Sequence, residues 1–262
     1  MYAPIVSVVM SAYNEEAAIA CAIQSILYQN LTNFELILID DSSTDTTLSI
    51  MEKYGRKDER IIILKNSSNI GLPASLNKGI AKSTSEFIAR MDADDYSYPD
   101  RLHLQYQFLQ KFPEISVVGS NAIIINEAGA ELSKTKMPLT HSIMAQHIIR
   151  KCPLIHPSVM YRKSFILSMH GYDEKLKKKQ DYDLWMRGCK LFKYANIEKP
   201  LIKYRVQNYK SIKTDLYGIY VRLLNALRQK KIITGIYWAL VTFTICQMRR
   251  VGYISKSQRK PY

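Results

Sequence analysis

The sequence predicts an α/β protein whose core is a doubly wound, mainly parallel β-sheet. Short apolar runs at residues 5–11, 35–40, 61–64 and 86–91 alternate with segments of helical pattern, as they do in chains of βαβ units. The first run, IVSVVMS, is almost continuously apolar, which is typical of a strand buried on both faces. The length of 262 residues and the apolar fraction of 47% suit one such domain, alone or with an appendage.

Helices are predicted between these strands. In chain order they cover residues 17–28, 46–54, 73–81 and 99–112. The second begins after the polar run DDSSTD, where Ser, Thr or Asp can accept from the free N–H groups of a first turn. The third begins at Pro73, because proline is favoured at the first helical position. Four strands and four helices in alternation fill the first half of the chain.

The second half of the chain predicts a less regular arrangement. Strands are expected at residues 115–118, 122–125 and 158–161, turns at 126–129 and 170–174, and a helix at 181–191. Four cysteines without C-x-x-C spacing indicate a reducing compartment and argue against a zinc site. The first four residues show no signal-peptide pattern.

Three acidic residues, Asp92, Asp94 and Asp95, follow the fourth predicted strand directly. In extended backbone, side chains alternate, so Asp92 and Asp94 are expected on one side and Asp95 on the other. Neighbouring carboxylates repel and raise each other's pKa, and a hard cation such as Mg²⁺ or Mn²⁺ removes that cost. The alternative is an acidic turn in which Asp95 or Asp100 caps the following helix. The position at the end of an apolar strand favours the metal site.

Other polar residues are predicted at the same edge of the sheet. Ligands of doubly wound sheets bind beyond the carboxyl ends of the strands. Tyr13 and Glu15 follow the first strand, and Asp41 follows the second. The sequence has neither G-x-G-x-x-G after the first strand nor G-x-x-x-x-G-K-[ST]. A bound nucleotide therefore needs another device, and a metal at the aspartates would supply it.

The sequence resembles glycosyltransferase family 2 on a GT-A fold in six ordered segments, which read SVVMSAYNEE, ELILIDDSSTD, NIGLPASLNKGI, EFIARMDADDYSYPDR, HGYDE and QDYDLWMR. The short form with LIHPSV in the second half is similar to bacterial enzymes that extend lipid-linked or lipopolysaccharide glycans. The resemblance implies a catalytic domain at residues 1–205, whose nucleotide-sugar-binding half is 1–100 and whose acceptor half is 101–205. A helical tail at 206–262 follows.

The resemblance implies roles for residues after the first two strands. Tyr13 would lie against the nucleotide base, with Ala12 and Glu15 beside it. Asp41 would accept from the uracil N3–H, which suits a carboxylate because it is an acceptor only. From the residues alone, Tyr13 is equally a packed loop aromatic and Asp41 a helix N-cap.

The remaining nucleotide residues implied by the resemblance come from later segments. Asp92 is expected near the ribose and Asp94 at the metal. Asn69, Gly71 and Asn77 match a family stretch near the nucleotide sugar. For these three, a turn followed by a surface helix is the alternative interpretation.

The acceptor side of the site is also implied by the resemblance. Asp181 would be the general base, although this sequence has Gln180 where the family motif has Glu. Asp183, Trp185 and His156 are assigned to the acceptor side. The alternatives are that Asp181 and Asp183 only stabilise the first turn of a helix through its dipole, that Trp185 is a core residue and that His156 is structural.

These roles predict an inverting, metal-dependent transfer of one sugar from a nucleotide sugar, with UDP-sugars favoured, to a glycan hydroxyl. The base takes the hydroxyl proton, a nucleoside diphosphate leaves, and Mg²⁺ or Mn²⁺ offsets the charge on the diphosphate. The absence of Q-x-x-R-W favours transfer of a single sugar over processive synthesis. A sugar nucleotidyltransferase and a non-catalytic nucleotide-sugar-binding protein are the alternatives.

Charge separates the tail from the rest of the chain. Residues 199–262 contain 14 Lys/Arg and one acidic residue, Asp215, whereas residues 1–198 contain 23 Lys/Arg and 22 Asp/Glu. Such a tail suits an anionic partner. A nucleic acid is disfavoured because the tail is apolar between its basic clusters.

The tail predicts two helices of different character. In residues 214–231, one face gathers Leu216, Ile219, Tyr220, Leu223, Leu224 and Leu227, while Arg222, Asn225, Arg228 and Gln229 are expected away from it. Residues 232–248 carry no charge but would span only about 25 Å, short of the ~30 Å hydrocarbon core. We therefore expect residues 214–262 to be a monotopic anchor on the cytoplasmic face of the cell membrane. Packing on the catalytic domain and a dimer interface are the alternatives.

Overall fold

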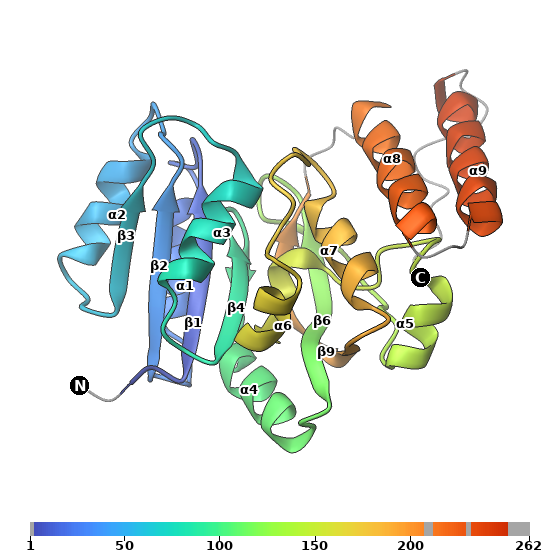
Figure 1. The fold of residues 1–262 in the computed structure, drawn as a ribbon. Helices are drawn as coiled ribbons and strands as arrows, with labels where there is room; N and C mark the ends of the chain where they lie inside the picture. The colour runs from blue at the N-terminus through green and yellow to red at the C-terminus, as the bar shows by residue number, and fades with distance from the viewer. Residues whose placement is uncertain (1–2, 207–211, 229–231, 251–262) are drawn as a thin grey trace.

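The structure is a computed structural model that describes residues 3–206, 212–228 and 232–250. Within these residues, nine strands form one sheet in the order β3-β2-β1-β4-β8-β6-β9-β5, with β7 paired to β6. Helices cover both faces of the sheet, and α8 and α9 lie at the opposite end of the molecule from α2 and β3 (Figure 1). The predicted α/β fold class is confirmed.

The first half, residues 3–100, follows the predicted alternation closely. Its parallel strands are β1 (Val6–Ala12), β2 (Phe34–Asp40), β3 (Ile61–Lys65) and β4 (Phe87–Asp92). The helices between them are α1 (Ile19–Leu27), α2 (Thr47–Gly55) and α3 (Leu72–Lys82). The in-register pairing of β1 with both β2 and β4 brings the carboxyl ends of these three strands to one edge.

Alternation along the strands divides the core between the two faces of the sheet. Along β1, Val8 packs in the cluster that contains α1, and Val9 packs in the cluster that contains α3. Helix α3 approaches the sheet through Gly79, where a Cβ would lie 2.6 Å from a Val9 methyl group. The close approach therefore depends on a residue without a side chain.

The second half, residues 101–206, mixes strand directions. Its strands are β6 (Ile115–Ile125), β7 (Glu131–Lys134), β8 (Met160–Arg162) and β9 (Lys193–Arg205), and the two-residue β5 (Tyr96–Ser97) pairs with β9. Its helices are α4 (Arg101–Lys111), α5 (His141–His147), α6 (Lys163–Ser168) and α7 (Gln180–Gly188), with a 3₁₀ turn at His156–Ser158. Strand β8 runs antiparallel to both β4 and β6, and so joins the halves.

Three expectations for the second half need correction. The strands predicted at 115–118 and 122–125 are one strand, because Gly119 and the polar residues after it are buried and β6 continues alongside β9 through a shift in register. The strand predicted at 158–161 begins at Met160, since Pro157 lies in a 3₁₀ turn. Strand β9 was not predicted at all, and Pro200 within it obscures the pattern.

Two helices follow the sheet, α8 (Ile212–Arg228) and α9 (Ile232–Arg250). Val221 of α8 belongs to the core cluster that contains α3 and α7, and Trp238 of α9 packs against that cluster. Tyr220 and Leu227 of the predicted apolar stripe are instead exposed, while the side chain of Leu216 lies outside the described residues. No helix in the described ranges is long and apolar enough to cross a membrane.

Candidate active site

Three carboxylates meet at the carboxyl end of β4. The ligand oxygens of Asp92, Asp94 and Asp95 lie within 4.8 Å of one another. The expected alternation is wrong for Asp95, because β4 ends at Asp92 and the chain turns, with the Asp95 amide donating to the Asp92 carbonyl at 3.5 Å. Asp100 occupies the N-cap position of α4 but makes no side-chain capping bond. Across the described ranges, no other three His, Cys, Asp or Glu residues are placed to hold one ion.

The acidic residues at this end of the sheet crowd one another. Burial and the charge of Asp92 raise the pKa of Asp94 to about 6. Burial, Asp92 and Asp94 raise the pKa of Asp95 well above its ordinary value. Glu15 shares this field, since burial followed by the charges of Asp94 and Asp92 raises its pKa to about 7. A cation placed among these groups would relieve their repulsion.

Two arginines border the acid cluster, and sequence reasoning missed both. Arg90 is fully buried and forms an ion pair with Asp92. Arg205 donates its backbone N–H to Asp95 Oδ1 at 2.7 Å and its Nε–H to the Asp94 carbonyl at 2.9 Å. A charged residue inside an apolar strand is a signal that could have found Arg90. Arg205 lies 110 positions from Asp95, so only the pairing of β9 brings it here.

The acid cluster fits a hard divalent cation. Asp95 Oδ2 is buried and has no hydrogen-bond partner in the structure, which is rare for a carboxylate oxygen. Oxygen-only ligands in close array suit Mg²⁺ or Mn²⁺. Sequence reasoning gave the metal to Asp94 alone, and the geometry adds Asp92 and Asp95 as candidate ligands.

The loops after β1 and β2 form a fixed rim next to the acid cluster. Asn14 and Ser42 have left-handed backbone, with φ of 55° and 65°, which is strained for residues other than glycine. The Asn14 amide donates to Ser43 Oγ at 3.1 Å, and the Thr44 amide donates to Asn14 Oδ1 at 2.8 Å. Tyr13 is 45% exposed rather than packed into the loop. Its ring is therefore accessible for stacking on a planar ligand.

Asp41 shapes the loop after β3. Its Oδ1 accepts from the Asn66 side chain at 2.8 Å and from the Ile70 amide at 2.9 Å, and its Oδ2 accepts from the Gly71 amide at 2.9 Å. It is not the N-cap of α2, because that position is held by Thr46. Any contact of Asp41 with a base would have to use the acceptor capacity that these three bonds leave.

Ala12 and Asn69 differ in what they offer a ligand. Ala12 is buried at the end of β1, and its carbonyl accepts from the Asp41 amide at 2.9 Å. Asn69 is exposed in the loop after β3. Ala12 can therefore present only a small surface to a nucleotide, whereas the Asn69 side chain is accessible.

Asn77 links the two halves of the sheet. Its Oδ1 accepts from the Tyr172 amide, and its Nδ2 donates to the Tyr172 carbonyl and to Glu174 Oε1, each at 2.9 Å. Gly171 has a φ of 73° and packs so closely that a Cβ would lie 2.6 Å from Asn77 Oδ1. The 170–174 turn thus engages the amide group of Asn77, and the expected role of Asn77 near the nucleotide sugar stays a prediction.

Asp181 lies half-buried in the first turn of α7. Tyr204 connects it electrostatically to the acid cluster, since burial and the charges of Asp92, Asp95 and Asp181 together raise the pKa of Tyr204. Lys179, just before α7, is left-handed with a φ of 64°. Strained backbone of this kind gathers at sites where geometry matters for function.

Two of the residues assigned to the acceptor side lie in the core instead. Trp185 is fully buried and stacks on Phe165 with ring centroids 6.1 Å apart. His156 is buried, with its Nε2 2.8 Å from the Tyr172 hydroxyl oxygen. Burial and the nearby Arg90 hold the pKa of His156 well below its usual range, so it is neutral. Neither residue is placed to contact an acceptor.

Asp183 is the third residue that was assigned to the acceptor side. It is fully buried, and its carboxylate accepts from Arg187 Nε at 2.7 Å and from the Asn225 side chain of α8 at 3.0 Å. Arg187 also donates to the Gly171 carbonyl at 2.9 Å. Two positions along a helix differ by about 200°, so Asp183 faces the core while Asp181 does not.

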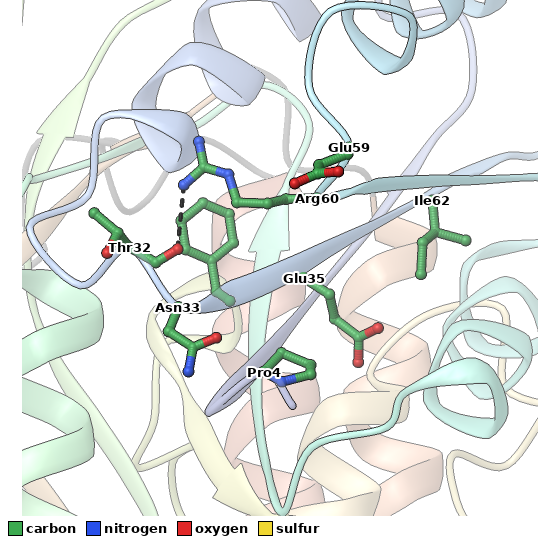
Figure 2. Close-up of a pocket in the computed structure, with 8 residues that line it drawn as sticks. Pro4, Thr32, Asn33, Glu35, Glu59, Arg60 and Ile62 are labelled. Carbon is green, nitrogen blue, oxygen red and sulfur yellow. Dashed lines mark hydrogen bonds between the residues drawn. The ribbon is translucent and has the colours of Figure 1, made fainter. Parts of the chain in front are cut away.

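A cavity of about 460 Å³ lies elsewhere, at the amino ends of the first three strands (Figure 2). Glu35 in its lining accepts from the Thr84 amide and hydroxyl at 2.7 Å, and Arg60 lies over Phe34 at 4.4 Å. Figure 2 shows Arg60 reaching back to the Thr32 carbonyl. These polar groups hold structure together, and the cavity is at the edge opposite the acid cluster.

The model of glycosyl transferase family 2 matches residues 7–173. The chain belongs to this family. It is 37% identical over 207 residues to the putative glycosyltransferase EpsE of Bacillus subtilis, covering 77% of this chain and 73% of EpsE. It is 31% identical over 245 residues to the O-antigen biosynthesis glycosyltransferase WbnJ of Escherichia coli, covering 91% of this chain and 94% of WbnJ. This family-2 chain is therefore a glycosyltransferase.

Solved structures share the fold of this glycosyltransferase. S. aureus TarS 1–349 in complex with UDP matches 85% of this chain and 65% of that one, with a TM-score of 0.68 and 23% identity. The mannosyltransferase PcManGT from Pyrobaculum calidifontis, in complex with GDP-Man and Mn²⁺, matches 97% of this chain and 77% of that one, with a TM-score of 0.67 and 15% identity. The GT-A expectation is confirmed by these neighbours.

Proposed function

We propose that this glycosyltransferase is an inverting, metal-dependent enzyme that transfers one sugar from a nucleotide sugar, with UDP-sugars favoured, to a hydroxyl of a lipid-linked or lipopolysaccharide-type glycan. The observation that carries the proposal is the acid cluster at the end of β4. Its three carboxylates lie close together, and one of their oxygens, Asp95 Oδ2, is buried without a hydrogen-bond partner. A second observation concerns Asp181. Its charge and the charges of Asp92 and Asp95 all contribute to raising the pKa of Tyr204, after burial.

The donor is bound at the rim of the first half. Tyr13 offers an accessible ring to the base, and Asn69 and Glu15 lie on the loops around it. Asp92, Asp94 and Asp95 would hold the metal ion, which when bound supplies positive charge to the diphosphate. Arg205 keeps the acidic turn in place through the Asp95 carboxylate and the Asp94 carbonyl.

The transfer step needs one base. Asp181 accepts the proton of the acceptor hydroxyl while that oxygen forms a bond to the anomeric carbon. The bond from the anomeric carbon to the diphosphate oxygen breaks on the opposite face, and its electron pair leaves with the nucleoside diphosphate. One displacement inverts the configuration, in contrast with the two carboxylates that a retaining glycosidase uses in sequence.

Names of relatives support a glycan acceptor. WbnJ is an O-antigen biosynthesis enzyme, and AmsE of Erwinia amylovora, 29% identical over 269 residues, is an amylovoran biosynthesis glycosyltransferase. Polysaccharides of these kinds are products of stepwise sugar addition. We infer that this enzyme extends such a glycan on a lipid carrier, at the cytoplasmic face of the cell membrane.

The proposal is tested by measuring nucleoside diphosphate release across a panel of nucleotide sugars, each with a lipid-diphosphate-linked acceptor. Asp181→Asn is expected to lower the rate of transfer about 10²–10⁴-fold while donor affinity stays within twofold. Glu198→Gln, an exposed acid of the same half, is the matched control and is expected to keep full rate. Release of pyrophosphate would identify a nucleotidyltransferase, and donor binding without turnover would identify a binding protein.

A further inference from the structure

We propose that the outer face of the α8–α9 pair docks on an anionic lipid bilayer. The outer face is defined as the exposed large side chains Tyr220 and Leu227 of α8 and Ile233, Ile236, Tyr237, Leu240 and Phe243 of α9. The inference rests on the proposed function in one respect, namely that the acceptor is lipid-linked. It adds which side chains meet the lipid and how the catalytic domain is oriented behind them.

Helix α9 is two-sided. Its five outer side chains, from Ile233 to Phe243, are between 46% and 87% exposed and recur with the period of a helix. On the other side, Ala239 is buried and Trp238 packs on the core, with the Arg150 guanidinium 5.1 Å from its ring centroid. A row of large apolar side chains on one side of a helix is a surface that marks an interaction site.

Helix α8 directs two polar side chains, Asn225 and Arg222, toward the second half, while Tyr220 and Leu227 are exposed. Asn225 is fully buried and donates to Asp183, and Arg222 donates to the Arg150 carbonyl at 3.0 Å. The sequence pattern placed Arg222 and Asn225 away from the apolar face of α8, and in the structure their side chains contact the second half. Arg222 also donates to Thr242 of α9, so the two helices are joined to each other and to the second half.

The charge of the sequence selects a bilayer over a second copy of the chain as the occupant. Residues 199–262 contain 14 Lys/Arg and one acidic residue. Lys230 and Lys231 precede α9 in the sequence, and Arg249 and Arg250 end it. The net positive charge of this segment opposes the association of two copies through it, whereas anionic head groups attract it. Tyrosines such as Tyr220 and Tyr237 suit the boundary between head groups and acyl chains.

Helix α8 connects the outer face to α7, the helix of the proposed base. Asn225 of α8 donates to Asp183, which stands two residues after Asp181 in α7. A protein docked through the outer face therefore keeps the helix of the proposed base at a fixed position relative to the bilayer. An acceptor hydroxyl on a lipid carrier would be presented along the same surface.

The test compares matched pairs of exposed apolar residues in the full chain. Ile236→Gln/Leu240→Gln alters the outer face, and Leu167→Gln/Leu191→Gln alters two exposed leucines of the second half. Each protein is floated with vesicles of phosphatidylcholine alone or with 30% phosphatidylglycerol, a composition chosen at roughly the anionic level of a membrane surface. Wild type and the leucine control are expected to partition onto the anionic vesicles, less strongly at high salt. The outer-face pair is expected to lose about 10-fold in partition coefficient.

Each other outcome has a defined meaning. Wild type that ignores anionic vesicles overturns the proposal, as does an outer-face pair that partitions like wild type. If ultracentrifugation shows a wild-type dimer that the outer-face pair dissociates, without a vesicle effect, the occupant is a second copy and the proposal is wrong. Because partition is measured without donor or acceptor, failure of the transfer reaction leaves this result intact. Near-native circular dichroism of each pair confirms that loss of partition is not loss of fold.

Discussion

The two halves of the sheet place the candidate functional residues differently. In the first half, the candidate residues stand on loops at the carboxyl ends of parallel strands, and Tyr13 and Asn69 are accessible there. In the second half, His156, Trp185 and Asp183 turn into the core, and of the assigned residues Asp181 is half-buried at the surface of α7. A parallel, in-register sheet fixes where its loops lie, whereas a mixed sheet does not.

The largest expected effect concerns the acid cluster of the first half. Asp94→Asn should reduce transfer by on the order of 10³-fold, because it removes charge from the residues proposed to hold the metal. Chelation of the wild type should have a similar effect. Initial rates and Mn²⁺ titration by electron paramagnetic resonance measure both consequences. Asp58→Asn, in an ion pair with Arg60, is the control, and full activity of Asp94→Asn would remove the metal site from the first half.

A smaller but clear effect is expected in the second half, on stability. Asp183→Ala should lower the free energy of unfolding by about 3 kcal/mol, since it leaves Arg187 and Asn225 without their shared carboxylate. Asp181→Ala should change it by less than about 0.5 kcal/mol, as surface substitutions do. Urea unfolding measures the two values. Equal losses would show that both acids are structural and would break the distinction drawn between them.

The third expectation concerns the rim. Tyr13→Ala should weaken donor binding about 10-fold, because stacking of an aromatic ring on a base contributes ~1–3 kcal/mol. Isothermal calorimetry with the donor or with the nucleoside diphosphate gives the dissociation constants. Tyr28→Ala, at a more exposed tyrosine on the same half, should leave them unchanged. An unaffected Tyr13→Ala protein would mean that the base lies elsewhere on the rim.

The smallest effect is a dependence of stability on pH in metal-free protein. The pKa of Asp94 is raised from 3.8 to about 6 and that of Glu15 from 4.5 to about 7, so the folded protein holds these protons more tightly than the unfolded chain. Their contribution to stability is therefore greatest at low pH and is lost as pH rises through this window. Tm should rise by a few degrees, roughly 2–5 °C, between pH 7.5 and pH 5.5.

Calorimetric scans at several pH values test this expectation, with Asp94→Asn as the control. The variant should show a shallower slope, because the group that titrates is gone. Divalent ion at pH 7.5 should also raise the Tm of wild type more than that of the variant. A wild-type Tm that falls on acidification from pH 7.5, with the same slope in the variant, would contradict the crowding of carboxylates.

The sequence predicted the first half well because its signals are local. Each strand was a short apolar run, and Asp92 and Asp94 were placed at the correct edge by the end of such a run. The turn that brings Asp95 to the same side was missed, since the expected alternation assumed that the strand continues. The contact of Asn77 with Tyr172 was missed because the two residues are 95 positions apart.

The second half resisted prediction because its signals are not local. Arg205 reaches the acid cluster through the pairing of β9, a strand whose pattern is interrupted by Pro200. Helical periodicity in α8 separated apolar from polar positions but could not show which polar side chains contact the second half. A buried carboxylate, Asp183, attracts the polar side of that helix, and no pattern within the helix can show this.

The position of β8 has a consequence for how the protein is made. Strand β4 pairs on one side with β1 and on the other with β8, at Met160–Arg162. Ile88 can therefore pair with Tyr161 only after about 70 further residues have been synthesised. At a ribosome that adds ~5–20 residues each second, this edge stays open for roughly 4–15 s after β4 has left the exit tunnel. An open, apolar edge invites pairing with other chains. Nascent chains of this enzyme should therefore need a chaperone most during the interval between β4 and β8.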